Sequence, residues 1–320
     1  VLNLGTVTMF MLMQTTSTMR ALGEVWMPLA LLLGANALNI ILDIVLLFGW
    51  EDLGIPAFGA PGAAYATVIA RGVASVLGLW WLARRSNPLR FTWMSWRDRH
   101  GEWLTLLAMA VHQIVQVMVR ALTVIALTRV ARELGGPEAV SALAVTTRLD
   151  TMVLFAAVGF ASAATTVTGR NVGARLVRRA RVVALAGGTM AFLVGGLMVF
   201  FFAWFARDLM GLFVNEAREE VVEAGRNYLL VAALGHPFGA FCVAVAGGLN
   251  GAGRMVPPMV IDLLGYLGVI LPAVVLTAAM GEASPAGLVG VWWVFAAGSA
   301  LLSVVYLIYT LRARWPLRHP

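Results

Sequence analysis

Six ionisable side chains lie deep inside long apolar stretches of the sequence, and they are the first candidates for chemistry. They are Asp43, Asp150, Asp262, Arg71, Arg120 and Arg148. An ionised group in hydrocarbon is unfavourable unless it is paired or hydrated, so each such residue is a candidate for function by default. The chemistry open to them is the binding of a cation, the carriage of a proton, or mutual neutralisation as a buried ion pair.

Asp43 is the leading candidate for binding an ion. Asn39 lies four residues earlier, on the same face of a helix, and Thr67 lies at a similar depth in the next apolar stretch. A carboxylate, an amide oxygen and a hydroxyl at one depth could coordinate sodium, and the carboxylate alone could instead carry a proton. A structural alternative is an ion pair between Asp43 and Arg71, which follows Thr67 by one helical turn.

Asp150 and Arg120 are predicted to form a buried ion pair. Each lies roughly a dozen residues from the same end of two neighbouring antiparallel stretches, so the two charges share one depth. The alternative is that Asp150 attracts a cationic substrate. Arg148 is two residues from Asp150 and faces elsewhere, so we assign it no role. Asp262 lies about 12 Å from the inner end of its stretch, where we expect a hydrated vestibule.

Three further polar residues are candidates for contact with a substrate or a buried charge. His236 precedes Pro237, and because proline has no N–H, a backbone carbonyl is left free nearby. We therefore expect the imidazole to form a local hydrogen bond. Gln113 and Gln116 supply neutral polar groups to the stretch 103–129.

Enzymatic chemistry finds no support in these residues. The single cysteine, Cys242, lies in an apolar stretch and can build neither a disulfide framework nor a cysteine metal site. We find no cluster of metal ligands, no phosphate-binding loop and no nucleophile beside a base. The sequence therefore predicts a protein that is not an enzyme and that needs no cofactor beyond a coupling ion, sodium or proton.

The elements that must position these residues are membrane-spanning helices. Hydrophobic residues make up 60% of the 320, charged residues only 12%, and mean hydropathy is +0.85. Apolar blocks of about twenty residues are long enough to cross about 30 Å of hydrocarbon, where only helices satisfy the backbone of such blocks. We predict an all-α, polytopic membrane protein with about nine transmembrane helices in two bundles. The spans are 1–20, 26–49, 60–83, 103–129, 140–168, 182–206, 226–250, 256–280 and 288–311.

The charges in the connections predict the topology. The net charge of +7 could suggest nucleic acid, but the arginines gather in alternate connections, as a cytoplasmic charge bias requires. One set of connections holds fifteen arginines and three acids, and the other holds five arginines and ten acids. We therefore predict a multi-pass protein of the cell inner membrane, with its C-terminus in the cytoplasm and Val1 on the outer side, and no nucleic-acid partner.

An internal repeat is visible. The segment 19–29 aligns with the segment 249–259, which places Gly23 opposite Gly253 at the start of an equivalent helix. Repeated bundles around a central site are typical of secondary transporters. The repeat therefore favours a transporter over a receptor or an enzyme.

Several segments resemble the multidrug and toxic compound extrusion (MATE) family of antiporters. They are Asn39–Asp43 with Leu46–Gly49, Gly62–Thr67, Gly159–Ala174, and Gly248–Gly253 with Pro257–Met259. Arg170 departs from the pattern, because the family usually has glutamine there. The resemblance implies helices four to twelve of a twelve-helix fold that works by alternating access, with the first three helices missing. It also implies an ion site that uses Asn39, Asp43 and Thr67 together with an acid on helix one, which this sequence lacks.

The expected organisation follows from this resemblance. Residues 1–90 would form a partial N-terminal lobe of three helices, residues 91–102 a cytoplasmic basic linker, and residues 103–320 a complete six-helix C-terminal lobe. The expected function is secondary antiport, which exports cationic or amphipathic small molecules in exchange for sodium or protons. The partners would be those small molecules and the lipid bilayer, and the protein would be a monomer. The alternatives are a lipid-linked saccharide flippase of the same superfamily and a non-transporting membrane scaffold.

Overall fold

The computed structural model describes residues 2–50, 56–84, 100–213, 219–281, 284–313 and 315. Every regular element within these ranges is helical, which confirms the predicted all-α class. The chain divides into two compact units, Val1–His100 and Gly101–Pro320, and each is described by itself. Most of the predicted linker, residues 91–99, lies outside the described residues.

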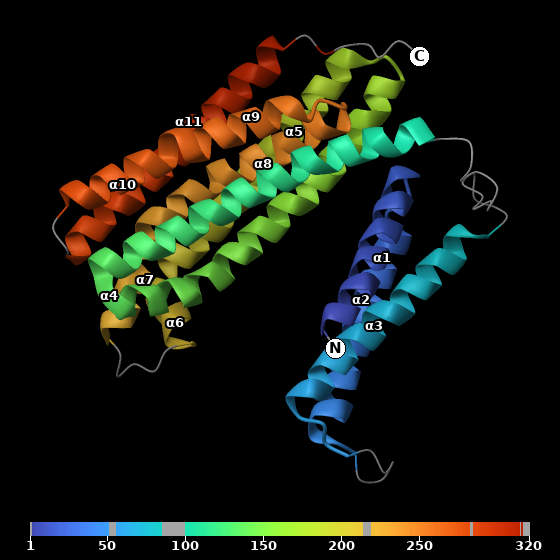
Figure 1. Ribbon diagram of the computed structural model, residues 1–320, viewed down its shortest axis with the longest axis horizontal. Helices are drawn as coiled ribbons and strands as arrows, with labels where there is room; N and C mark the ends of the chain where they lie inside the picture. Colours follow the sequence, from blue (N-terminus) through green and yellow to red (C-terminus); the bar gives the residue numbers. More distant parts are fainter. Residues whose placement is uncertain are drawn as a thin grey trace. The chain divides into compact units, whose positions relative to one another are not determined.

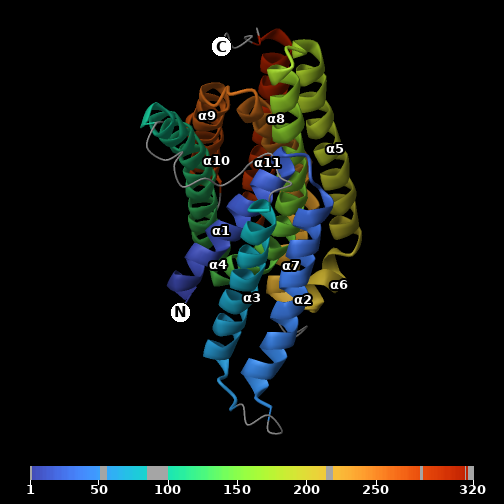
Figure 2. The ribbon, with the colours of Figure 1, turned by 90° about the vertical axis from the view of Figure 1, so that its right-hand side faces the viewer.

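The first unit consists of α1 (Leu2–Ala21), α2 (Trp26–Phe48) and α3 (Ala60–Leu82). The helix α3 packs against both others (Figures 1 and 2), because small residues recur along one of its faces. Ala66, Ala70 and Ala74 are spaced by four residues and are almost fully buried. Small side chains let helix backbones approach closely, as is usual between membrane helices.

The second unit begins with the long element α4 (His100–Gly173), which folds back on itself. The reversal occurs at Gly136, whose φ of 66° favours glycine, and Pro137 follows it directly. The two arms of α4 therefore run in opposite directions (Figure 1). The first arm lies beside α9 (Val256–Asp262), and the second lies beside α5 (Val177–Trp204) and α8 (His236–Gly251), as Figure 2 also shows.

One long span of the second unit is broken in its middle. It comprises α7 (Glu219–Val231), the 3₁₀ turn η3 (Ala232–Gly235) and α8, and the short α6 (Ala206–Gly211) precedes it. The break lies just before Pro237, which has no N–H to continue the α-helical pattern. It places His236 at the start of α8, where the helix changes its winding.

A second irregularity lies in the next span. It runs from α9 through the π-helical segment η4 (Leu263–Ile270) to α10 (Leu271–Met280). π-Helical turns are rare in proteins and are frequent at functional sites. The last helix, α11 (Pro285–Arg312), starts with Ser284, whose hydroxyl accepts a hydrogen bond from the Gly287 N–H at 3.3 Å.

The number of spans agrees closely with the sequence prediction. Within the described residues, seven helical stretches are long and apolar enough to cross a membrane. One of them, Trp103–Gly173, contains the reversal at Gly136 and so holds two of the predicted spans. The element α1 is helical as predicted but is not among the seven. The chain is therefore a multi-pass membrane protein.

The two glycines aligned by the internal repeat adopt the same turn. Gly23 has a φ of 92° and Gly253 a φ of 75°. The N–H of Gly23 donates to Arg20, three residues back, and the N–H of Gly253 likewise donates to Asn250. A left-handed glycine that ends a helix is the usual C-terminal cap. The sequence alignment therefore pairs two positions that share one backbone conformation.

The second arm of α4 lies very close to the backbone of α8 at Gly247. A Cβ at this position would lie 2.6 Å from the carbonyl oxygen of Ala161, and the Gly247 carbonyl accepts a hydrogen bond from Thr165 Oγ1 at 2.8 Å. We expect Gly247→Ala to lower stability by about 1–3 kcal/mol, because backbone must move to admit the methyl group. The melting temperature of the purified protein in detergent measures this loss.

The matched control is Gly159→Ala on the second arm of α4. A Cβ there meets no other atom within 4 Å. Alanine has the higher helix propensity, so this variant should be as stable as the original protein or slightly more so. Equal melting temperatures for both variants would contradict the close approach at Gly247.

Candidate functional site

The second unit contains an open cavity of about 370 Å³. Its walls come from both arms of α4 and from α7, η3, α8, η4 and α11. Most of the lining side chains are apolar or aromatic, and a few polar groups interrupt them. They include Asp150, Tyr228, His236 and Arg120. A largely apolar cavity of this size with a few convergent polar groups is the usual form of a small-molecule site.

One polar cluster of the cavity centres on Asp150. Its Oδ2 accepts a hydrogen bond of 2.6 Å from the Tyr228 hydroxyl, and its Oδ1 lies 3.0 Å from His236 Nε2. The Asp150 side chain is 17% exposed, so the carboxylate still reaches the cavity. The Tyr228 ring packs edge-on against Trp292 with centroids 5.1 Å apart, which fixes the direction of its hydroxyl. We call Asp150, Tyr228 and His236 the carboxylate cluster.

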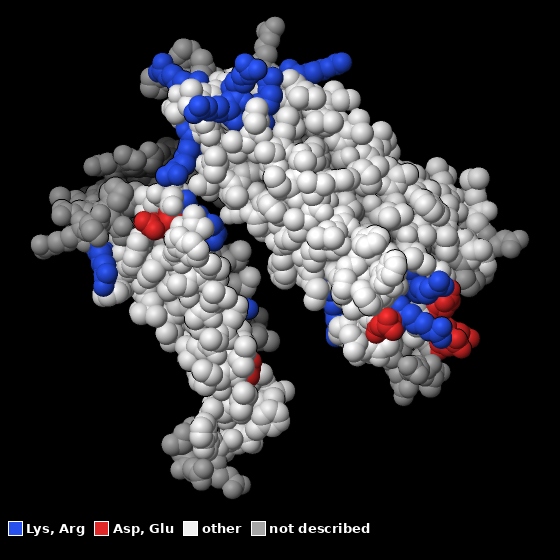
Figure 3. Space-filling view, turned by 180° about the vertical axis from the view of Figure 1, so that it is seen from behind, with Lys and Arg blue, Asp and Glu red and all other residues white. Residues whose placement is uncertain are grey.

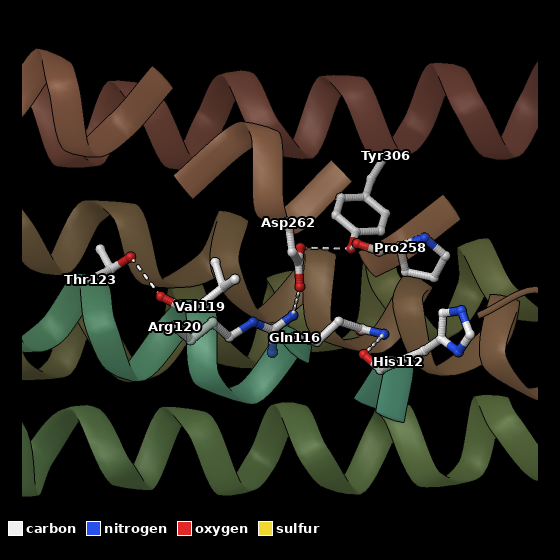
Figure 4. Close-up of polar contacts among 8 residues, drawn as sticks. All are labelled: His112, Gln116, Val119, Arg120, Thr123, Pro258, Asp262 and Tyr306. Carbon is white, nitrogen blue, oxygen red and sulfur yellow. Dashed lines mark hydrogen bonds and ion pairs between the residues drawn. The ribbon is translucent and has the colours of Figure 1, made fainter. Parts of the chain in front are cut away.

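A second polar cluster centres on Asp262, the last residue of α9 (Figure 4). Arg120 Nη2 lies 2.7 Å from Asp262 Oδ2, and the Tyr306 hydroxyl donates to Asp262 Oδ1 at 2.7 Å. The same hydroxyl lies 3.2 Å from the carbonyl oxygen of Pro258. We call Arg120, Asp262 and Tyr306 the arginine cluster. It links α9 to the first arm of α4 and to α11, at the residue that directly precedes the π-helical segment η4 in the chain.

Two sequence predictions about these charges are wrong. Arg120 pairs with Asp262 and not with Asp150, because a shared depth says nothing about the direction in which each side chain leaves its helix. Asp262 does not lie in a hydrated vestibule, because its side chain is 0% exposed and both oxygens are bonded. Burial of this carboxylate is tolerable because the Arg120 guanidinium neutralises its charge and the Tyr306 hydroxyl donates a hydrogen bond to it.

The prediction for His236 was a local hydrogen bond. The structure adds a contact that was not predicted, because Nε2 reaches across to Asp150 on the second arm of α4. The break at η3 leaves this residue at the first position of α8, with its side chain facing the cavity. The arrangement is consistent with an ion pair whenever the imidazole is protonated.

The glutamines of the first arm do not join the cavity. Gln116 is buried, and its Nε2 donates to the His112 carbonyl at 3.4 Å, one turn back on the same helix. Gln113 is exposed on the surface of the second unit. Neither residue lines the cavity, so their predicted contact with a substrate has no structural counterpart here.

Sequence reasoning missed Tyr228 and Tyr306. Each is buried, and each bonds one of the acids that the sequence singled out. A signal was present, because the chain has only five tyrosines and a buried tyrosine hydroxyl needs a hydrogen-bond partner. A search confined to ionised groups could not find them.

Two of the three predicted ion ligands in the first unit contact each other. Asn39 Nδ2 donates to Thr67 Oγ1 at 3.4 Å, so these two side chains meet between α2 and α3. Asp43 Oδ1 is buried and has no hydrogen-bond partner. In the described structure no ion pair joins Asp43 to Arg71, which is exposed and lines a cavity of about 230 Å³ with Asn39 and Thr67. An unpaired buried carboxylate oxygen is compatible with a cation ligand.

No metal site with three or more His, Cys, Asp or Glu side chains is present in the part of the chain that the structure describes. The candidate ligands in the first unit are a carboxylate, an amide and a hydroxyl, as the sequence suggested. Such a set of oxygen ligands suits a hard cation better than the metals that prefer imidazole and thiolate.

Charge is distributed unevenly over the second unit. Basic side chains gather at the end where α4 passes into α5 and where α11 finishes (Figure 3). They include Arg170, Arg175, Arg178, Arg179, Arg181, Arg254 and Arg312. Acids and bases mix at the opposite end, where α6 and α7 meet. A basic end opposite a mixed end is the pattern that orients membrane proteins.

Comparison with known proteins gives a consistent result. The sequence profile MatE matches residues 108–275, more than half of the chain. The "Probable multidrug resistance protein YoeA" of Bacillus subtilis (strain 168) is 24% identical over 305 residues, which are 94% of this chain and 64% of that protein. The "Probable multidrug resistance protein NorM" of Brucella suis biovar 1 (strain 1330) is 30% identical over 299 residues, which are 91% of this chain and 60% of that protein.

A solved structure shares the fold. It is described as the outward-facing conformation of a multidrug resistance MATE family transporter of the MOP superfamily. The superposition has a TM-score of 0.84 at 21% identity and covers 93% of this chain and 64% of that one. The chain therefore spans about three fifths of the length of these relatives.

Proposed function

The chain belongs to the MATE family, and from this premise we propose that it exports cationic or amphipathic small molecules by secondary antiport. Export would be driven by the inward flow of sodium or protons and would proceed by alternating access. We place the protein in the cell inner membrane as a monomer, with its C-terminus in the cytoplasm. The proposal further divides the chain into a partial N-terminal lobe (1–90), a basic linker (91–102) and a C-terminal lobe (103–320).

The observation that carries this proposal is the cavity in the second unit. Apolar and aromatic side chains surround one carboxylate, Asp150, which two donors hold in place and which remains in part exposed. In a low-dielectric site a carboxylate attracts a cation far more strongly than it does in water. The apolar wall of the cavity can thus bind the apolar part of an amphipathic cation, and the Asp150 carboxylate can bind its positive charge.

The coupling ion would bind in the first unit. We propose that Asp43, Asn39 and Thr67 hold sodium, or that Asp43 alone carries a proton. The hydrogen bond between Asn39 and Thr67 and the unpartnered Asp43 oxygen support this assignment. Arg71 lines a cavity with Asn39 and Thr67 and forms no ion pair with Asp43, so the carboxylate stays available.

The flippase alternative receives less support from the geometry. A pyrophosphate-linked lipid would call for several unneutralised bases in the cavity. Of the three bases considered in the sequence, Arg120 alone lines this cavity, whereas Arg71 belongs to the first unit and Arg148 lies over the Phe213 ring. A scaffold would need neither a cavity nor buried charge clusters.

Dye efflux from energised cells tests the proposal. Cells that express the protein should export the cationic dye rhodamine B ethyl ester, and Asp43→Asn should reduce the export rate at least about tenfold at equal expression, because the ion ligand loses its charge. Sodium and pH jumps in membrane vesicles then identify the ion. The control is Glu24→Gln, a charge removed from an exposed residue between α1 and α2, which should leave export unchanged.

The outcomes separate the parts of the proposal. Normal export by Asp43→Asn would remove the coupling role from Asp43 and leave the exporter assignment intact. Absence of export even by the original protein, at verified expression, would contradict cationic efflux and favour the flippase alternative.

A further inference from the structure

The cavity of the second unit carries a base as well as an acid, and the two lie on different walls. Asp150 projects from the second arm of α4 and is held by residues of α7 and α8. Arg120 projects from the first arm and is held by Asp262 of α9, which Tyr306 of α11 supports. Each charge has its own partners, and the structure shows no bond between the two clusters. The cavity therefore holds two polar clusters with separate partners, in a lining that is otherwise largely apolar.

The arginine cluster points its positive end at the cavity. Asp262 is 0% exposed and does not line the cavity, whereas the Arg120 side chain is 28% exposed and does. The pair is neutral as a whole, but it is a dipole whose cation lies nearer to any molecule in the cavity. A fixed dipole in a water-poor site acts strongly on a nearby charge.

Arg120 also has hydrogen-bond donors to spare. A guanidinium carries five N–H groups, and the ion pair with Asp262 is a single contact from Nη2. Nη1 has no hydrogen-bond partner and, unlike the unpartnered Nε–H, it is not buried, so its N–H groups are open to a ligand in the cavity. The fork geometry of the guanidinium fits the two oxygens of a carboxylate.

Asp262 would not compete with such a ligand. Both of its oxygens are already satisfied, one by Arg120 and the other by Tyr306. A ligand carboxylate could therefore bond the remaining N–H groups while the internal pair stays intact. The acid of the other cluster, Asp150, would at the same time attract a cationic nitrogen.

We propose that this cavity selects zwitterions, with the cationic nitrogen at Asp150 and the carboxylate at Arg120. The inference rests on the proposed transport function and adds a specificity-determining residue, Arg120, to it. A molecule with a cation at both ends would meet the positive end of the arginine cluster and be disfavoured. A simple monocation would satisfy Asp150 but leave the Arg120 donors unpartnered, so it would bind more weakly than the matching zwitterion.

A matched pair of dyes tests this selectivity. Rhodamine B carries a delocalised cation and a carboxylate, and its ethyl ester has the same cation without the acid. We expect the purified protein in detergent to bind rhodamine B about tenfold more tightly than the ester, as one charge-assisted hydrogen bond would provide. Fluorescence anisotropy titration measures both dissociation constants under one set of conditions.

Variants of the arginine cluster then locate the source of the preference. The double variant Arg120→Met/Asp262→Leu removes both charges together, which avoids leaving one of them buried alone. It should lose the tenfold preference for rhodamine B, measured as the ratio of the two dissociation constants. Arg120→Lys keeps the charge but lacks the fork, and should retain only part of the preference. Melting temperatures show which variants are folded.

The possible results are distinct. Equal affinities of the original protein for the two dyes, or a preference that persists in either folded variant at full strength, would overturn the zwitterion proposal and leave export of cations standing. If the double variant does not fold, the lysine variant and the two dyes on the original protein still decide the question. Failure of both dyes to bind would instead contradict the cavity as a drug site, and with it the proposed function.

Discussion

Asp262→Leu is expected to lower the stability of the protein by about 3–5 kcal/mol, one of the largest losses for any single substitution in the second unit. The substitution leaves Arg120 buried without its counter-charge and the Tyr306 hydroxyl without its main acceptor. An uncompensated charge in an apolar interior costs far more than the lost contact itself. The free energy of unfolding in detergent, from a denaturant titration, measures the effect.

The double variant Arg120→Met/Asp262→Leu distinguishes charge from packing. Replacement of a whole buried ion pair by apolar residues of similar volume is often neutral or stabilising. We therefore expect the double variant to recover most of the stability that Asp262→Leu loses. A double variant as unstable as the single one would show that shape at the end of α9, and not charge neutralisation, is what matters there.

The ion pair between Arg120 and Asp262 lies where α9 passes into the π-helical segment η4, and it holds the helices together there. Asp262 is the last residue of α9, and the π-helical segment η4 begins at the next residue. A π-helical turn shifts the hydrogen-bond pattern of the backbone and leaves the neighbouring turn less regular. The bonds from Arg120 and Tyr306 fix α9 to the first arm of α4 and to α11 at this point. The cluster therefore fixes the span to two neighbours at the point where its backbone changes from α-helical to π-helical winding.

The sequence predicted the fold well because the membrane leaves few choices. Length and hydropathy locate the spans, since an apolar block of about twenty residues can only cross as a helix. The sequence also predicted the reversal inside α4, from the turn residues Gly135, Gly136 and Pro137. In the structure the chain reverses at Gly136, which has a positive φ. Span length and turn chemistry are local properties, so one sequence suffices to read them.

The pairing of buried charges could not be read in the same way. Counting residues gives the depth of a side chain, and on that basis Arg120 and Asp150 were matched. It does not give the rotation of each helix about its own axis, which depends on packing against every neighbour. Arg120 faces α9 and α11, and Asp150 faces α7 and α8. The breaks at η3 and η4 further change these directions, and neither was predicted.

For the polar residues of the first unit, the structure contains the side-chain contact that the sequence predicted. Asn39 and Thr67 were assigned to one site by a family resemblance and by their shared depth, and their side chains do meet. Neighbouring helices joined by a short connection have few ways to pack, so a two-helix contact is easier to predict than a contact among four spans. Their role in binding an ion stays a prediction.

Asp150→Asn should abolish export of cationic dyes and weaken their binding by about 30-fold or more. The asparagine keeps the shape of the side chain and can still accept the hydrogen bond from Tyr228, but the cavity loses its only carboxylate among the described lining residues. Removal of a desolvated charge partner costs about 2–5 kcal/mol in binding, which corresponds to the stated factor at its lower limit. Anisotropy titration with rhodamine B ethyl ester measures the dissociation constant, and efflux assays measure export.

Asp208→Asn provides the matched control, because it makes the same chemical change at an exposed residue of α6. It should bind and export the dye as the original protein does. If Asp150→Asn also behaves normally, Asp150 serves only to hold Tyr228 and His236, and the cavity recognises its cargo by apolar contact alone. If it loses the ester and rhodamine B equally while the arginine-cluster variants lose only rhodamine B, the two clusters of the cavity act independently. Recognition would then be divided between two charges that the chain keeps apart by binding each to partners of its own.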